Sequence, residues 1–159
     1  MGLFKLPVVI KSFDLIANKR LISAVQWYHR GGIFRLLSVV RHCRNRRKYS
    51  CMVPPTIKIG SNLKIPHAVG IIIGETSEIG NNCTIFPNAM IIARHSPHKK
   101  NPSGRRHARI GDNCMIGAGA IIVGDITIGN NVSIGAGAIV SKNVPDNTVV
   151  INVNEHKTL

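Results

Sequence analysis

The chain has 159 residues and a formal net charge of +14, with 44% hydrophobic but only 4% aromatic residues. This length accommodates one domain with an appendage, and the low aromatic content excludes a core of large rings in favour of stacked aliphatic side chains. No signal peptide with a cleavage site and no apolar run long enough to span a bilayer is apparent, so we expect a cytoplasmic protein.

The first segment, residues 1–50, is predicted to be helical and basic. It holds eleven Lys and Arg against one acid, Asp14. A first helix is expected from Ser12 to about Tyr28, and Gly31-Gly32 separates it from a second, amphipathic helix. We expect residues 33–48 to contact an anionic membrane at its inner face, with a merely solvated basic face as the alternative. Nucleic acid is not expected as a partner, because no reading motif or aromatic platform accompanies the charge.

A six-residue repeat runs through residues 51–150. It places an aliphatic residue at every sixth position and a small or aliphatic residue four positions later. The repeated aliphatic positions are Ile59, Ile65, Ile71, Ile79, Ile85, Ile91, Ile110, Ile116, Ile122, Ile128, Ile134 and Val140. Because strand side chains alternate between two faces, a period of six lets one strand and one corner recur in register, and three repeats close one triangular turn. The repeat predicts an all-β solenoid, a parallel β-helix, followed by a C-terminal tail at 151–159.

The repeat is interrupted at two places. Eight residues separate Ile71 from Ile79, which predicts a two-residue insertion at a corner around Gly74-Glu75-Thr76. The segment 93–109 is rich in His, Lys, Arg, Pro and Gly, and we expect it to project as a loop. Loops on a rigid scaffold are frequent positions of functional residues.

The four cysteines form no CxxC pair. Cys83 and Cys114 fall on the small position of the repeat, so we expect buried core residues rather than redox or metal chemistry.

Two histidines are candidates for acid-base chemistry. His67 follows an inward Ile65 by two positions, and His107 lies where the projecting loop returns. Imidazole has a pKa suited to a general base near neutrality. Taken alone, each is more typical of an ordinary polar surface residue.

The residues around these histidines resemble the hexapeptide-repeat acyltransferases, in their serine acetyltransferase-like branch. The matching run is H-A-V-G-I-I-I-G-E-T from His67 to Thr76, with Arg106-His107 and the later Gly-Ala corners, within residues 53–150. The resemblance implies a left-handed parallel β-helix, acetyl-CoA as acyl donor, no metal, and a homotrimer with active sites between subunits.

The resemblance also implies roles for individual residues. His67 would take the proton from the acceptor hydroxyl, with His107 in the same pocket, Glu75 supporting the imidazole pair and Arg106 binding the acceptor. A carboxylate on one ring nitrogen fixes the tautomer and stabilises the imidazolium. Acetyl-CoA would lie along the small corners, and the residues implied for it are Gly117, Ala118, Gly135, Ala136 and Lys142.

Departures from the family affect the predicted acceptor. Pro66 and Met52 stand where serine acetyltransferases carry aspartates, and Arg105 stands at a third aspartate position. Because its N-terminal segment is short, the chain also resembles the O-acetyltransferases of capsule and exopolysaccharide biosynthesis. We therefore predict acetyl transfer to a hydroxyl of a sugar or polysaccharide precursor, with L-serine as the alternative acceptor.

Two other classes stay open. One is a zinc-dependent lyase resembling γ-type carbonic anhydrases, for which His67, His95, His98 and His107 are the candidate ligands. The other is a catalytically inactive scaffold.

Overall fold

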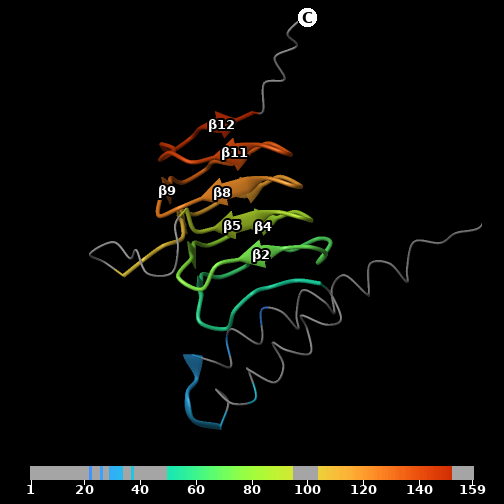
Figure 1. The fold of residues 1–159 in the computed structure, drawn as a ribbon, viewed down its shortest axis with the longest axis vertical. Coiled ribbons are helices and arrows are strands. Elements are labelled where there is room, and N and C mark those ends of the chain that lie inside the picture. The colour runs from blue at the N-terminus through green and yellow to red at the C-terminus, as the bar shows by residue number, and fades with distance from the viewer. Residues whose placement is uncertain are drawn as a thin grey trace, which may run out of the picture.

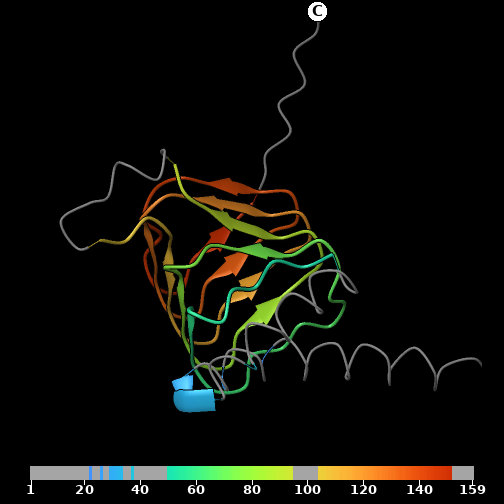
Figure 2. The same cartoon turned by 60° about the horizontal axis from the view of Figure 1, so that its bottom comes forward.

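The computed structural model describes residues 22, 26, 29–33, 37, 50–94 and 104–151. Its main body is a stack of triangular coils built from short parallel strands (Figure 1). Seen with the bottom of the stack brought forward, the strands lie on separate sides of a prism (Figure 2). The six-residue repeat thus gives the three-sided parallel β-helix that it predicts.

Three four-stranded sheets form the sides of this prism, and we name them by the character of their outward side chains. The charged sheet consists of β1 (Lys58–Ile59), β3 (Glu78–Ile79), β6 (Arg109–Ile110) and β9 (Thr127–Ile128). The mixed sheet consists of β4 (Thr84–Ile85), β7 (Met115–Ile116), β10 (Ser133–Ile134) and β12 (Val149–Val150). The apolar sheet consists of β2 (Ile72–Ile73), β5 (Met90–Ile92), β8 (Ile121–Val123) and β11 (Ile139–Val140).

The core is a set of aliphatic columns that run up the inside of the prism. Ile122, for example, pairs in register with Ile91 below and Val140 above, and its side chain is fully buried. Cys51, Cys83 and Cys114 are buried in the same core, which confirms the expected burial of the two repeat cysteines, while Cys43 lies outside the described residues. Each coil buries its inner face only against its neighbours, so stability accrues coil by coil.

The glycine that follows many of the aliphatic positions is required by the spacing of the coils. A Cβ on Gly117 would lie 2.6 Å from the Ala136 amide nitrogen, and one on Gly111 would lie 2.7 Å from the Gly129 carbonyl oxygen. At the corner between the charged and mixed sheets the turns use asparagine in left-handed backbone. Asn82, Asn113 and Asn131 have φ values of 56°, 57° and 55°. Their side chains form a ladder, in which Asn82 Nδ2 donates to Asn113 Oδ1 at 3.1 Å and Asn113 Nδ2 donates to Asn131 Oδ1 at 3.2 Å.

The two-residue insertion lies at a different corner from the predicted one. Strand register pairs Ile73, not Ile71, with Ile91, so the longer spacing falls between Ile65 and Ile73. The prediction at Gly74-Glu75-Thr76 was wrong because Ile71 occupies the small position of the repeat. An isoleucine there is easily taken for the aliphatic residue that recurs every six positions. The extra residues therefore lie in the turn that contains His67.

Two corners flank the apolar sheet. We call residues 66–70, 86–88, 117–119 and 135–137 the entry corner, because the chain passes through them from the mixed to the apolar sheet. We call the described residues 74–77, 93–94, 104–108, 124–125 and 141–143 the exit corner, where the chain leaves the apolar sheet for the charged one.

The N-terminal segment is described only in part. Ile22, Gln26 and His29 have helical backbone, and a break follows, with positive φ at Gly31 and Gly32 as the Gly-Gly pair predicts. The remaining predictions for this segment, including membrane contact through 33–48, fall largely outside the described residues, as does most of the projecting loop. Within the described residues, no helix is both long and apolar enough to cross a membrane.

Candidate active site

His107 is buried at the exit corner, with 5% of its surface exposed. Its ring lies against the backbone of Gly74, where a Cβ would be 2.0 Å from ring atom Cδ2 and 2.1 Å from Nε2. Only glycine leaves room for the imidazole at this point. Burial lowers the pKa of His107, and the nearby charge of Arg106 lowers it further, while Glu75 acts in the opposite direction.

Thr76 holds one ring nitrogen of His107. Nδ1 lies 2.8 Å from Thr76 Oγ1 and accepts a hydrogen bond from the Thr76 amide at 3.3 Å. The same hydroxyl oxygen accepts hydrogen bonds from the amides of Arg106 at 3.0 Å and of His107 at 3.3 Å. Thr76 belongs to the motif from His67 to Thr76, but no role was predicted for it; its position directly after Glu75 was the available signal.

Glu75 and Arg106 form an ion pair beside the imidazole. Arg106 Nη2 lies 3.2 Å from Glu75 Oε1, and the glutamate side chain is 59% exposed. Glu75 was expected to support the imidazoles, yet within one chain the partner of His107 Nδ1 is Thr76, because the glutamate side chain is engaged by Arg106. The structure thus brings Glu75, Arg106 and His107 to one corner.

Arg105 and Arg94 fix the two ends of the segment between β5 and β6. Arg105 forms an ion pair with Asp125 at 2.9 Å, one coil above, and Arg94 donates to the Ser141 carbonyl oxygen. Arg105, which replaces a family aspartate, therefore has a carboxylate partner that the sequence reasoning did not identify. These contacts anchor the return of the chain to His107.

His67 lies at the entry corner, on the opposite edge of the apolar sheet from His107. Its side chain is exposed, because the two-residue insertion lengthens the turn that carries it. The residues expected to bind acetyl-CoA, Gly117, Ala118, Gly135 and Ala136, lie at the same corner in later coils. Lys142 follows β11 at the exit corner and is exposed.

The residues at the entry corner are small for two physical reasons: the next coil packs closely against Gly117, and two other glycines have left-handed backbone. Gly117 is required by the close approach of the next coil, as described above, whereas Ala118 and Ala136 are exposed. Gly119 and Gly137 have φ values of 67° and 68°. The result is a column of short side chains along which a ligand chain could lie against the backbone.

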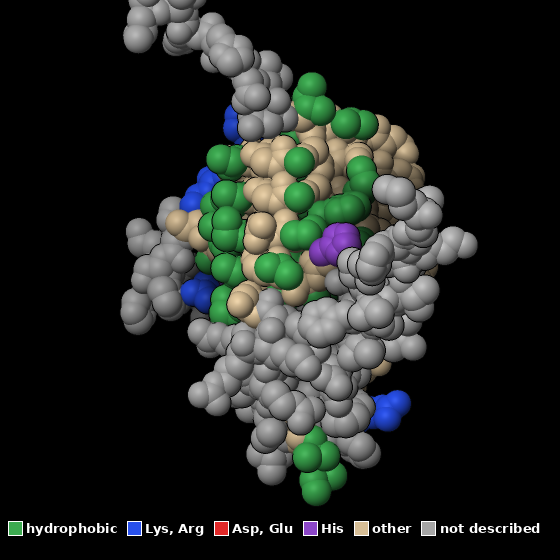
Figure 3. All heavy atoms as spheres, turned by 90° about the vertical axis from the view of Figure 1, so that its right-hand side faces the viewer, with side chains coloured by type: hydrophobic (Ala, Val, Ile, Leu, Met, Phe, Trp, Pro, Cys, Tyr) green, Lys and Arg blue, Asp and Glu red, His purple; other side chains and the backbone are tan. Residues whose placement is uncertain are grey.

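The outward side of the apolar sheet carries an unbroken aliphatic column. Neighbouring coils align its members in register, and these are Met52, Ile72, Met90, Ile121 and Ile139. Ile139 is 70% exposed. The charged sheet differs, because Lys58 and Arg109 both pair with Glu78 there and hold the pKa of that carboxyl below its usual value. A side view shows hydrophobic side chains gathered in columns that run up the stack, from one coil to the next (Figure 3).

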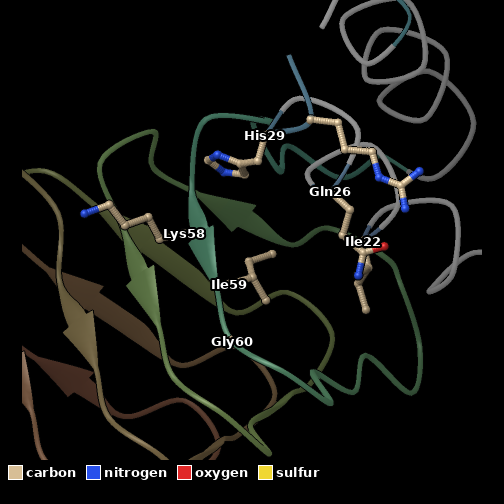
Figure 4. Close-up of a pocket in the computed structure, with 7 residues that line it drawn as sticks. Ile22, Gln26, His29, Lys58, Ile59 and Gly60 are labelled. Atoms are coloured by element: carbon tan, nitrogen blue, oxygen red, sulfur yellow. The ribbon is translucent and has the colours of Figure 1, made fainter. Parts of the chain in front are cut away.

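A separate cavity of about 540 Å³ lies between the N-terminal helical residues and the first coil. Its lining residues are Ile22, Gln26, His29, Arg30, Lys58, Ile59 and Gly60 (Figure 4). The His29 ring nitrogen Nε2 is 2.9 Å from the Ile57 carbonyl oxygen, which attaches this segment to the coil. None of the predicted site residues lines this cavity.

The described residues contain no group of three His, Cys, Asp or Glu side chains that could hold a metal ion. His95 and His98, two of the candidate zinc ligands, lie outside the described part.

Comparison with known proteins identifies the repeat. Residues 107–142 match the family model of the bacterial transferase hexapeptide (six repeats). The chain is 39% identical over 117 residues to chloroplastic serine acetyltransferase 1 of Arabidopsis thaliana, a match that covers 74% of this chain and 36% of the relative. It is 40% identical over 104 residues to a serine acetyltransferase of Staphylococcus epidermidis, covering 65% of this chain and 46% of the relative.

This chain carries the bacterial transferase hexapeptide repeat, and its similarity to serine acetyltransferases extends over 74% of its length. Solved structures agree: soybean serine acetyltransferase apoenzyme aligns with a TM-score of 0.73 at 34% identity, covering 89% of this chain and 55% of that one. The Neisseria gonorrhoeae serine acetyltransferase aligns with a TM-score of 0.74 at 30% identity, covering 88% and 52%. Together with the three parallel sheets, these likenesses fit the predicted left-handed β-helix. The chain spans about half, or less, of the length of these relatives.

Proposed function

We propose that the protein is an acetyl-CoA-dependent O-acetyltransferase that acts as a homotrimer, with L-serine as its first candidate acceptor. The relatives described above are named serine acetyltransferases, which supports the L-serine alternative better than the sugar acceptor predicted from the sequence. The observation that carries the proposal is that His67 and His107 flank the two edges of one apolar sheet.

This arrangement favours a site made by two copies of the chain. A single chain separates the histidines by the width of the apolar sheet. In a three-fold ring whose apolar sheets face the axis, the entry corner of each copy meets the exit corner of the next, because cyclic symmetry joins unlike edges. The aliphatic column of the sheet supports burial in such an assembly, since an apolar row of this kind is rarely left in water.

The chemistry we propose is direct transfer with one base. His67 takes the acceptor hydroxyl proton as that oxygen attacks the acetyl carbonyl carbon of acetyl-CoA. The carbon–sulfur bond then breaks, and the CoA sulfur recovers the proton from His67. A positioned base contributes roughly 10²- to 10⁴-fold to the rate. A backbone N–H at the entry corner would stabilise the oxyanion.

The remaining residues would position the two substrates. Arg106, one-sixth exposed and paired with Glu75, is suited to a carboxylate such as that of serine. The short side chains at Ala118 and Ala136 let the pantetheine arm approach backbone amides. Lys142 at the exit corner of the neighbouring copy would meet a CoA phosphate.

The test is an acetyl-transfer assay that follows release of the CoA thiol from the full-length protein. We expect turnover with acetyl-CoA and L-serine that falls about 10²-fold or more in His67→Ala. The Thr127→Val variant, on the outer side of the charged sheet, should behave as the wild type. Absence of transfer to any acceptor, with no measurable acetyl-CoA binding, would favour the inactive scaffold instead.

A sugar hydroxyl is the second candidate acceptor. It is favoured by Pro66 and Met52, which replace two aspartates of the family, and by Arg105, which replaces a third. A site without these carboxylates has less to offer the ammonium group of an amino acid. The same assay with a panel of sugars decides between the two: faster turnover on a sugar than on L-serine would reverse their order.

The trimer has its own test. Ile121→Glu puts a charge into the middle of the aliphatic column, and we expect it to convert a trimer into monomers by sedimentation velocity while the coils stay folded. Glu78→Gln on the charged sheet is the matched control. A wild-type monomer at assay concentrations would contradict the shared site.

A further inference from the structure

We infer that Thr76 is a positioning residue that fixes His107 as the Nε2–H tautomer, so that His107 is a hydrogen-bond donor in the active site and His67 is the only imidazole base. This inference rests on the proposed acetyl transfer, but its central measurement does not require activity.

The direction of the hydrogen bonds decides the tautomer. A backbone amide can only donate, and the Thr76 amide points at His107 Nδ1 from 3.3 Å. Nδ1 must therefore be the unprotonated nitrogen of the neutral ring, which leaves the proton on Nε2.

The Thr76 hydroxyl reinforces this assignment. Its oxygen already accepts from the amides of Arg106 and His107, so its lone pairs are engaged and its own proton is available for Nδ1 at 2.8 Å. The Thr76 hydroxyl thus accepts hydrogen bonds from two backbone amides and donates one to Nδ1. With its lone pairs engaged in this way, it has little freedom to become the acceptor in its hydrogen bond with Nδ1.

The other ring nitrogen, Nε2, lies beside Gly74. The only buried side-chain nitrogen or oxygen without a partner in the described part of the chain is Ser77 Oγ, so Nε2 is not a buried orphan. The ring itself is wedged against Gly74. His107 therefore presents an N–H at the exit corner, suited to the acceptor oxygen or to the acetyl oxygen as charge develops there.

The charges around His107 agree with a neutral ring. Burial and Arg106 lower its pKa, and Glu75, the opposing carboxylate, is engaged by Arg106. A neutral imidazole whose Nε2 carries the proton cannot take a second proton from substrate through that atom. Base chemistry is then left to the exposed His67.

The primary experiment is ¹⁵N NMR of the histidine side chains at pH 7.5. The chain has seven histidines, and His107→Gln assigns the relevant signals by their loss. We expect His107 in the wild type to be neutral with its proton on Nε2. A charged ring or a proton on Nδ1 would overturn the inference whether or not the protein transfers acetyl groups.

Two threonine variants test the positioning role. Thr76→Val removes the hydroxyl at nearly constant shape, and we expect a detectable Nδ1–H population and about a tenfold lower kcat, as the loss of one hydrogen bond implies. The KM for acetyl-CoA should stay within about twofold, and Thr76→Ser should restore kcat, because it keeps the same hydrogen bonds. Thr127→Val controls for the substitution itself.

The failures can be told apart. If the wild type transfers no acetyl group to any acceptor, the proposed function fails while the NMR result still decides the tautomer. Equal kcat in Thr76→Val and Thr76→Ser, with an unchanged tautomer, would reduce Thr76 to a structural residue. Unfolding midpoints of all variants, measured alongside, show whether a lost activity reflects a lost fold.

Discussion

The packing of His107 against Gly74 gives a prediction whose size follows from the structure. Gly74→Ala would place a Cβ 2.0 Å from His107 Cδ2, 2.1 Å from Nε2 and 2.4 Å from Cγ. Unstrained carbon contacts begin at about 3.5 Å, so the ring must move by more than about 1 Å. That movement breaks both hydrogen bonds that Thr76 makes to Nδ1.

The expected cost combines two effects. Each lost hydrogen bond lowers the free energy of unfolding by about 1 kcal/mol, and forcing a methyl group into a filled site adds about 1–3 kcal/mol. We therefore expect Gly74→Ala to destabilise the protein by about 3–5 kcal/mol. Turnover of the folded fraction should fall about a hundredfold, because a displacement of 1 Å at a reacting group costs about that much.

A double-mutant cycle measured by urea denaturation, at one fixed protein concentration, isolates the contact. In a His107→Ala background the ring is gone, so adding Gly74→Ala should change the free energy of unfolding by less than about 0.5 kcal/mol. The reasoning is refuted if Gly74→Ala costs the same with and without the imidazole, since the strain would then lie elsewhere.

Three further predictions concern other parts of the molecule. His67→Ala should lower turnover by about 10²-fold or more without changing the unfolding midpoint, because the side chain is exposed; near-normal turnover would remove His67 as the base. Ile122→Ala should lower the free energy of unfolding by about 3 kcal/mol, because the side chain is fully buried between Ile91 and Val140, and a cost under about 1 kcal/mol in denaturation would contradict the stacked core. Because the pKa of His107 is lowered by folding, its contribution to stability is present above its unfolded pKa and is lost as the pH falls through the folded value. Wild type and His107→Gln should accordingly differ less in unfolding free energy at acid pH than at pH 7.5, and a pH-independent difference would speak against a buried neutral ring.

The extent of the fold that could be predicted follows from the repeat. A period of six is a local property of the chain, and it determines which side chains point inward and where corners occur, so residues such as Ile122 and Cys114 were assigned correctly. It fails where a residue type suits two positions. Ile71 fills a small position with an aliphatic side chain, and only the pairing of Ile73 with Ile91 reveals that the insertion lies beside His67.

The amino-acid sequence by itself determined the solenoid, its aliphatic columns and the residue types able to do acyl-transfer chemistry, because each of these depends on spacing along the chain. The tertiary structure decided which of those residues meet. It joined Thr76 to His107 across 31 positions of sequence, paired Arg105 with Asp125, and set His67 and His107 on opposite edges of one sheet. The physical reason is that contacts between coils depend on strand register and corner length, and these are fixed only when the coils stack.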